Sequence, residues 1–77
     1  MYTEESLIEL GNGYLEETPE RCELFFIGDD IYEFNNLDLD VVFDYFEDKG
    51  YICYTDEYAI DNGNFELEPC KVLVITK

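Results

Sequence analysis

The chain is 77 residues long and carries twenty acidic residues against four basic ones, for a net charge of −16. This length predicts one globular domain, residues 1–77, and the apolar content of 47% is too high for a disordered chain. The charge excludes direct binding to nucleic acid or to an anionic membrane, because both require basic patches. It favours a basic protein as partner.

The three cysteines, Cys22, Cys53 and Cys70, indicate a reducing compartment. An odd number of cysteines without a framework spacing is not typical of a secreted disulfide scaffold. The sequence shows neither a secretory signal peptide nor an apolar run long enough to span a membrane. We therefore expect a cytoplasmic protein in which the three thiols are small buried apolar groups.

Residues 4–10 are predicted to form a short N-terminal helix. Thr3 is a suitable N-cap, Glu4 and Glu5 complement the positive end of the helix dipole, and Gly11 suits the left-handed position that ends a helix. The alternative is a hairpin in which "SLIEL" and "YLEET" pair across the turn "GNG".

The segment after Pro19, "CELFFIGDDIYEF", is predicted to form two strands. Its β-branched and aromatic residues favour strands over 22–27 and 31–34, and Gly28, Asp29 and Asp30 supply the chemistry of a turn between them.

Residues 37–49 are predicted to form the main helix. Asn35 or Asn36 can cap it, and Gly50 ends it after Lys49. Apolar side chains recur at i, i+3, i+4 and i+7 on one face and are flanked by further apolar residues: Leu39, Val42, Phe43 and Phe46, with Leu37, Val41 and Tyr45 beside them. Acids occupy much of the remaining surface: Asp40, Asp44, Glu47 and Asp48.

Strands are predicted for the rest of the chain. "YICYT" (51–55) forms one, "YAI" (58–60) and "FELE" (65–68) form a hairpin across "DNGN", and "KVLVITK" (71–77) forms a final strand. The apolar run of the final strand is nearly continuous, which favours a central position. The predicted class is α+β: an antiparallel sheet of about four to six strands, with the main helix packed on it and a short N-terminal helix.

Enzymatic chemistry is not expected. The chain has no histidine and a single serine, and no pair of carboxyl groups stands out from the twenty acids as a general acid and base. "DNGN" followed by Glu66 lacks the spacing of an EF-hand, and three scattered cysteines without histidine lack the spacing of a zinc site. We expect neither a metal nor another cofactor.

The acids are therefore the candidate functional groups. Residues three or four apart on a helix lie ~5–6 Å apart at Cβ, a spacing comparable to that of successive phosphates in nucleic acid. Tyrosines interleave with these acids in "YEF", "DYFED" and "YTDEY", and tyrosine rings can stack on arginine. The simpler alternatives are a solvated acidic face and half-buried strand tyrosines. The predicted partner-binding residues are Asp29, Asp30, Glu33, Asp38, Asp40, Asp44, Tyr45, Glu47, Asp48, Tyr54, Asp56, Glu57 and Tyr58.

In size, in charge and in the acid–aromatic stretches "DDIYEFNNLDLD" and "DYFED", the chain resembles the small acidic DNA-mimic inhibitors of phages and mobile elements. These include anti-CRISPR and anti-restriction proteins and inhibitors of uracil-DNA glycosylase. The resemblance covers the whole chain and implies an anti-CRISPR protein that acts in the cytoplasm of a bacterial host and occupies the DNA- or guide-binding groove of a Cas effector. Because such proteins have many unrelated folds, it assigns no individual residue.

Two alternative functions fit the same charge. One is an immunity protein that neutralises a basic nuclease toxin. The other is an acidic adaptor domain in which tyrosine and phenylalanine anchor the partner while the charge provides solubility. A dedicated calcium-binding module is a further alternative. The sequence does not predict the oligomeric state.

Overall fold

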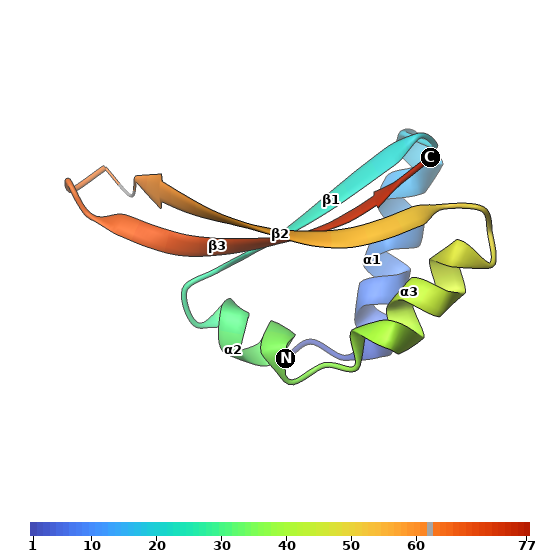
Figure 1. Cartoon of the computed structure of the whole chain (residues 1–77), viewed down its shortest axis with the longest axis horizontal. Helices are drawn as coiled ribbons and strands as arrows, with labels where there is room; N and C mark the ends of the chain where they lie inside the picture. Colours follow the sequence, from blue (N-terminus) through green and yellow to red (C-terminus); the bar gives the residue numbers. More distant parts are fainter. Residues whose placement is uncertain (62) are drawn as a thin grey trace.

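The computed structural model describes residues 1–61 and 63–77, and these form an α+β fold (Figure 1). The elements are α1 (Glu4–Glu17), β1 (Arg21–Ile27), α2 (Asp30–Asn35), α3 (Leu39–Glu47), β2 (Ile52–Asp61) and β3 (Leu67–Thr76). The described strands form one antiparallel sheet in the order β1-β3-β2. The predicted class is confirmed, but the sheet has three strands instead of four to six.

The strand number was overestimated because β2 and β3 are long. Their pairing runs without a break from Ile52 opposite Thr76 to Asp61 opposite Leu67. The predicted strands 51–55 and 58–60 are therefore parts of one strand, β2. The predicted strands 65–68 and 71–77 are parts of β3, which begins only at Leu67. The polar residues between the predicted strands lie on an exposed edge strand, where they do not interrupt the pairing. The turn predicted over "DNGN" includes residue 62, which lies outside the described residues.

The central position predicted for the last strand is confirmed. Four consecutive residues of β3 are almost completely buried: Val72, Leu73, Val74 and Ile75, at 1%, 0%, 1% and 0% exposure. Leu73 and Ile75 lie under the helices, whereas Val72 and Val74 belong to a smaller cluster of buried residues on the other face of the sheet.

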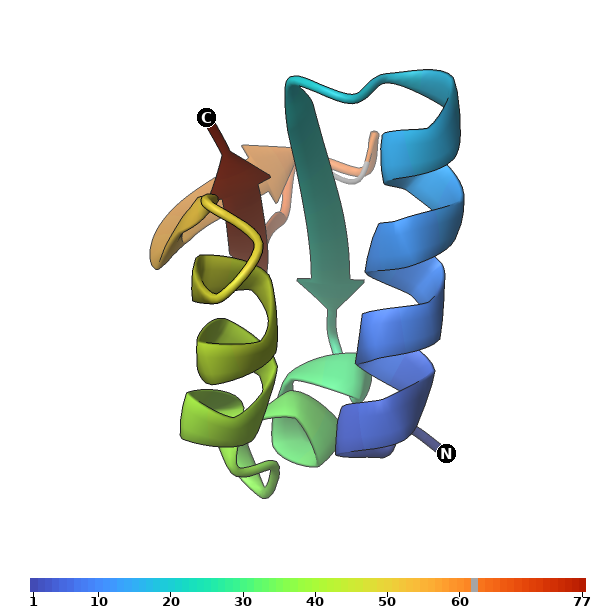
Figure 2. The same cartoon turned by 90° about the vertical axis from the view of Figure 1, so that its right-hand side faces the viewer.

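All three helices pack on the same face of the sheet (Figures 1 and 2). Buried side chains from each helix meet those of β1 and β3 in one core: Leu7, Leu15, Cys22, Leu24, Phe26, Phe34, Val42, Phe46, Leu73 and Ile75. β1 ends opposite Cys70, so the far end of the β2–β3 hairpin projects beyond the helices (Figure 1).

The N-terminal helix is longer than predicted, and the hairpin alternative is wrong. α1 begins after Thr3, which forms a capping box with Ser6, and continues through Gly11 to Glu17. Gly11 does not end the helix, because it lies on the buried face of α1, against the side chains of Phe46 and Ile75. Tertiary packing at this glycine outweighs its low helix propensity.

The strand predicted over 31–34 is wrong, because these residues belong to α2. Gly28 ends β1 with a φ of 62°, and the N–H of Ile31 then donates to the Gly28 carbonyl at 3.1 Å. In helical spacing Ile31 and Phe34 both reach the core, and Phe34 is only 2% exposed. In a strand, residues three apart would point to opposite faces.

The main helix is confirmed but shorter, and its predicted N-cap is wrong. The predicted C-terminal glycine is confirmed: Gly50 has a φ of 92°, and the N–H groups of Gly50 and Tyr51 donate to carbonyls of the last helical turn. α3 starts after Asp38, whose carboxylate accepts a hydrogen bond from the Asp40 N–H at 3.2 Å. Asn35 and Asn36 instead end α2. α3 and α1 lie side by side and run in the same direction, with α2 between their lower ends in Figure 2.

Among the described residues, no helix is long and apolar enough to cross a membrane. All three cysteines are free. Cys22 and Cys70 are buried as predicted, and Cys53 is half-buried.

Candidate acidic interface

The outer face of α3 carries a row of exposed carboxylates. Val42 and Phe46 are fully buried, and the acids lie on the opposite side of the helix. Acids four positions apart are separated by ~6 Å along the axis, because an α-helix rises ~1.5 Å per residue. We call this set the α3 row: Asp40, Asp44, Glu47 and Asp48.

α1 carries a second row of exposed acids, which the sequence reasoning missed. Leu7, Gly11 and Leu15 form its buried face, and the acids lie opposite. The helix was predicted over residues 4–10 only, so Glu16 was not placed on the same face as Glu5 and Glu9. Their spacing of four and seven residues was the signal that could have revealed them. We call this set the α1 row: Glu5, Glu9 and Glu16.

Contacts between the helices hold the two rows side by side. The Nδ2 of Asn12 donates to the hydroxyl of Tyr45 at 2.9 Å, and the N–H of Asp38 donates to Oε1 of Glu4 at 3.3 Å. The ammonium of Lys49 lies 4.5 Å from the centre of the Tyr45 ring. Tyr45 thus joins α3 to α1, a role inside the chain that the sequence did not predict.

Lys49 and Asn12 also affect the acidity of Tyr45. Hydrogen bonding to the Lys49 ammonium, and then to Asn12, lowers the pKa of the Tyr45 hydroxyl below its ordinary value of 10.0. The same cation lies over the ring, so Lys49 is engaged with Tyr45 rather than with the carboxylates of the α3 row.

The other basic side chains are also engaged within the chain. Arg21 pairs with Glu23 at 2.7 Å, Lys71 pairs with Glu57 at 3.3 Å, and the ammonium of Lys77 lies 5.3 Å from the Tyr51 ring. Among the described residues, the only other ion pair joins the N-terminal ammonium to Glu33 at 3.7 Å. Neither acidic row therefore contains a carboxylate that is ion-paired to a described residue.

α2, which carries Asp30 and Glu33, lies near the N-terminal ends of α1 and α3 (Figure 2). Asp29 and Asp38 are exposed, whereas Asp30 and Glu33 are half-buried. Glu33 accepts a hydrogen bond from the Tyr2 N–H at 3.3 Å and also pairs with the chain terminus. Glu33 therefore anchors the N-terminus, and Asp38 caps α3.

The predicted residues of β2 do not join this surface. Tyr54, Asp56 and Tyr58 alternate onto the helix-free face of the sheet, while Glu57 points to the other face, where it meets Lys71. Tyr58 donates to Oδ2 of Asp56 at 3.3 Å, and the Asp56 charge is the main cause that raises the pKa of the Tyr58 hydroxyl. The structure thus divides the thirteen predicted residues among α2, α3 and β2.

The acids and thiols of the described residues are the groups that metal binding and nucleophilic chemistry would use. Within 1–61 and 63–77, no group of three or more acids and cysteines is arranged to hold a metal ion. Burial is the main cause that raises the pKa of the Cys22 thiol, and it raises the pKa of Cys53 to about 11. Near neutral pH these two cysteines are thiols, which are poor nucleophiles.

No family model, curated protein or solved structure matches this chain. The interface must therefore be interpreted from its own geometry.

That geometry is two adjacent rows of carboxylates on parallel helices. Packed helices lie ~8–10 Å apart, and successive acids along each row are ~6 Å apart. The side chains are exposed and need no rearrangement to meet a partner. Such a surface can bind a basic surface of similar extent through many weak, salt-sensitive contacts.

Proposed function

We propose that this protein binds the nucleic-acid-binding surface of a basic protein and blocks it by presenting a phosphate-like pattern of carboxylates. The observation that carries the proposal is the pair of acidic rows on α1 and α3, none of whose acids is ion-paired within the described chain. A helix that only needed solubility would gain stability from lysine or arginine placed three or four residues from each acid.

The spacing of the rows supports imitation of a phosphate backbone. A protein groove built for nucleic acid holds arginine and lysine side chains at intervals that match phosphates. Carboxylates ~6 Å apart on two neighbouring helices can meet several of these cations at once. The resemblance to phage inhibitors makes a Cas effector the first partner to test, with restriction endonucleases and basic nuclease toxins as alternatives.

The direct experiment measures competition with nucleic acid. A panel of purified Cas effectors, restriction endonucleases and nuclease toxins is mixed with labelled target DNA or guide RNA, with and without a stoichiometric amount of this protein. We expect at least one member to lose nucleic-acid binding, and the loss to be reversed as salt is raised, because the competing contacts are electrostatic. If every member keeps its nucleic acid at low salt, the proposal is wrong.

Matched charge variants locate the surface on the partner so identified. Asp40→Asn with Asp44→Asn should weaken binding about 2- to 30-fold, since each exposed ion pair contributes roughly 0.2–1 kcal/mol and 1.4 kcal/mol is tenfold. The control is Glu66→Gln with Glu68→Gln, which changes the net charge equally at the start of β3. Equal weakening by both pairs would show that only net charge matters.

A second candidate function, an adaptor domain, is supported by the helix-free face of the sheet. Large apolar side chains are exposed there, including Phe25 at 55%, Ile52 at 61% and Tyr58 at 53%. Binding through this face would change little with salt, because apolar contacts are not screened. The salt dependence of affinity therefore separates the two functions.

A further inference from the structure

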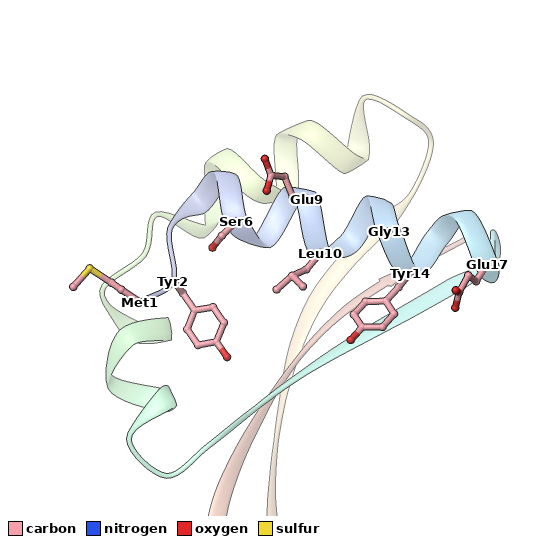
Figure 3. A pocket seen from close by; sticks show the side chains of 8 residues that line it. All are labelled: Met1, Tyr2, Ser6, Glu9, Leu10, Gly13, Tyr14 and Glu17. Carbon is pink, nitrogen blue, oxygen red and sulfur yellow. The ribbon is translucent and has the colours of Figure 1, made fainter.

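A groove runs between α1 and β1 on the side of the molecule away from α3. Tyr2, Leu10 and Tyr14 project into it toward β1 (Figure 3). It comprises a hollow of about 560 Å³ along α1 and an adjoining one of about 320 Å³ that is also lined by residues 23–26 of β1. Leu10 and Tyr14 are 40% and 52% exposed, so this flank of α1 covers little of the core.

The wall that β1 contributes to this groove is the free edge of a sheet. β1 is paired only with β3, so its other edge has no neighbouring strand in the described chain. The Lys77 N–H donates to the Glu20 carbonyl at 3.0 Å, which fixes the alternation of hydrogen bonds along the antiparallel pair. Cys22, Leu24 and Phe26 therefore exchange hydrogen bonds with β3.

The residues of β1 that alternate with Cys22, Leu24 and Phe26 direct their backbone groups away from β3. By the same alternation, the N–H and C=O groups of Glu23, Phe25 and Ile27 point to the free edge. Unpaired groups on an edge strand are a template for another extended chain. The groove thus offers backbone donors and acceptors on one side and the apolar flank of α1 above them.

The charge around this groove indicates what kind of chain fits it. Glu9, Glu17 and Glu23 line it, and neither Glu9 nor Glu17 is ion-paired to a described residue. Among the described residues that line it, Met1 alone contributes a cation, the N-terminal ammonium, which pairs with Glu33, while Glu23 pairs with Arg21 outside the lining. An occupant therefore gains from basic side chains at its solvent-facing positions and from apolar side chains under α1.

We propose that β1 accepts a fourth strand from a partner protein, an extended segment in which basic and apolar residues alternate. The segment pairs with the free edge at Glu23, Phe25 and Ile27, and its apolar side chains contact Leu10 and Tyr14. This mode of recognition is strand addition, in which the main chain provides affinity and alternate side chains provide specificity. The inference rests on the proposed function, because it names the segment of the basic partner that lies beside the acidic rows.

A second copy of this chain is a less suitable occupant. Pairing two β1 edges would bring together two chains that each carry a net charge of −16. A basic segment meets attraction at the same place.

The test uses the peptide acetyl-(Lys-Val)4-amide as probe and acetyl-(Lys-Gly)4-amide as a control of equal charge. Binding is followed by nuclear magnetic resonance of the intact protein, with amide hydrogen exchange read at β1. At saturation we expect the Lys-Val peptide to slow exchange at Glu23 and Phe25 about tenfold or more and the control to leave it unchanged. No added protection at β1 overturns the proposal, even if the peptide binds elsewhere.

N-methylated peptides separate main-chain pairing from simple charge attraction. One version is methylated at the backbone nitrogen of every valine, and another at the backbone nitrogen of every lysine. Alternate backbone N–H groups of a strand face the same edge, so one of the two versions lacks the donors that face β1 while all its side chains remain. We expect one version to bind at least about tenfold more weakly than the parent. If both bind like the parent, strand addition is wrong.

Variants with matched exposure test whether the apolar flank of α1 contacts the peptide. Leu10→Ala with Tyr14→Ala should weaken binding of the Lys-Val peptide about tenfold. Val41→Ala with Tyr58→Ala removes side chains of similar exposure, 48% and 53%, outside the groove and should change affinity less than about twofold. The opposite order overturns the assignment, as does a dimer of the free protein seen by sedimentation and abolished by the groove variant.

The two proposals can fail separately. The Asp40→Asn, Asp44→Asn variant leaves the groove intact and should bind the Lys-Val peptide with less than about a twofold change, although it weakens the basic partner. If the peptide results fail while the competition with nucleic acid succeeds, the acidic rows remain the interface and the fourth strand is discarded.

Discussion

Gly11 of α1 lies directly against Phe46 of α3. A Cβ atom at Gly11 would be 2.6 Å from Cζ of Phe46 and 3.1 Å from Cδ1 of Ile75. The first distance is far below van der Waals contact, so only glycine permits the observed packing. This contact sets how closely the two helices approach, and it therefore sets the separation of the acidic rows.

Alanine substitutions at the two glycines of α1 should have opposite effects. Gly11→Ala should lower the free energy of unfolding by about 1–3 kcal/mol, because overpacking outweighs the gain of ~1 kcal/mol in helix propensity. Gly13 has no atom within 4 Å of its Cβ position, so Gly13→Ala should raise stability by about 0.5–1 kcal/mol. Urea unfolding measures both. A stabilised Gly11→Ala variant would mean that the helices are not in this contact.

Tyr45 was predicted to contact a partner, but it also has an internal hydrogen bond whose loss can be measured. Tyr45→Phe removes the hydroxyl that accepts from Asn12 and keeps the ring that packs on Phe46 at a centroid distance of 5.0 Å. We expect a loss of about 0.5–1.5 kcal/mol in the free energy of unfolding. Asn12→Ala should lose a similar amount, and the double variant little more, because both remove the same bond.

Partner affinity then tests the sequence prediction for Tyr45. If the residue only joins the helices, Tyr45→Phe changes affinity for the partner less than about twofold. A loss of tenfold or more, about 1.4 kcal/mol, with a small loss of stability would instead place the hydroxyl in the interface.

The sequence predicted the elements whose signals are local. The apolar pattern of α3, the strand β1 and the central position of β3 follow from side-chain periodicity or from a continuous apolar run. The true end of α1 could not be predicted, because the glycine pattern around Gly11 is that of a helix terminus or a turn. Its helical conformation depends on Phe46, 35 positions further along the chain.

The candidate site also divides into parts with a local sequence signal and parts that depend on distant residues. The α3 row was predicted because the helix that carries it was predicted. The α1 row was missed because its helix was taken to end before Glu16. The groove beside β1 depends on strand order and on how α1 lies over the sheet edge, and neither is encoded in a local pattern.

Salt should affect folding and binding in opposite directions. Between about 0.01 M and 1 M salt the Debye length shortens from ~30 Å to ~3 Å. Screening reduces the repulsion among twenty acids in the folded chain, so we expect the stability to rise by about 1 kcal/mol, seen as a Tm increase of ~4–8 °C. Thermal unfolding followed by circular dichroism measures this change. Partner affinity should fall over the same range, so weaker binding at high salt cannot be attributed to unfolding.

The Cys53 thiol should make stability depend on pH above neutrality. Burial, and secondarily the charge of Glu47, raises its pKa from 9.0 to about 11. The folded chain keeps this proton where the unfolded chain loses it, so the contribution is complete below pH 9 and is lost as pH rises toward 11. The urea midpoint of the native protein should therefore fall more steeply over this range than that of Cys53→Ala, in which the other titrating groups remain. Parallel curves for the two proteins would show that Cys53 ionises as freely in the folded chain as in the unfolded one.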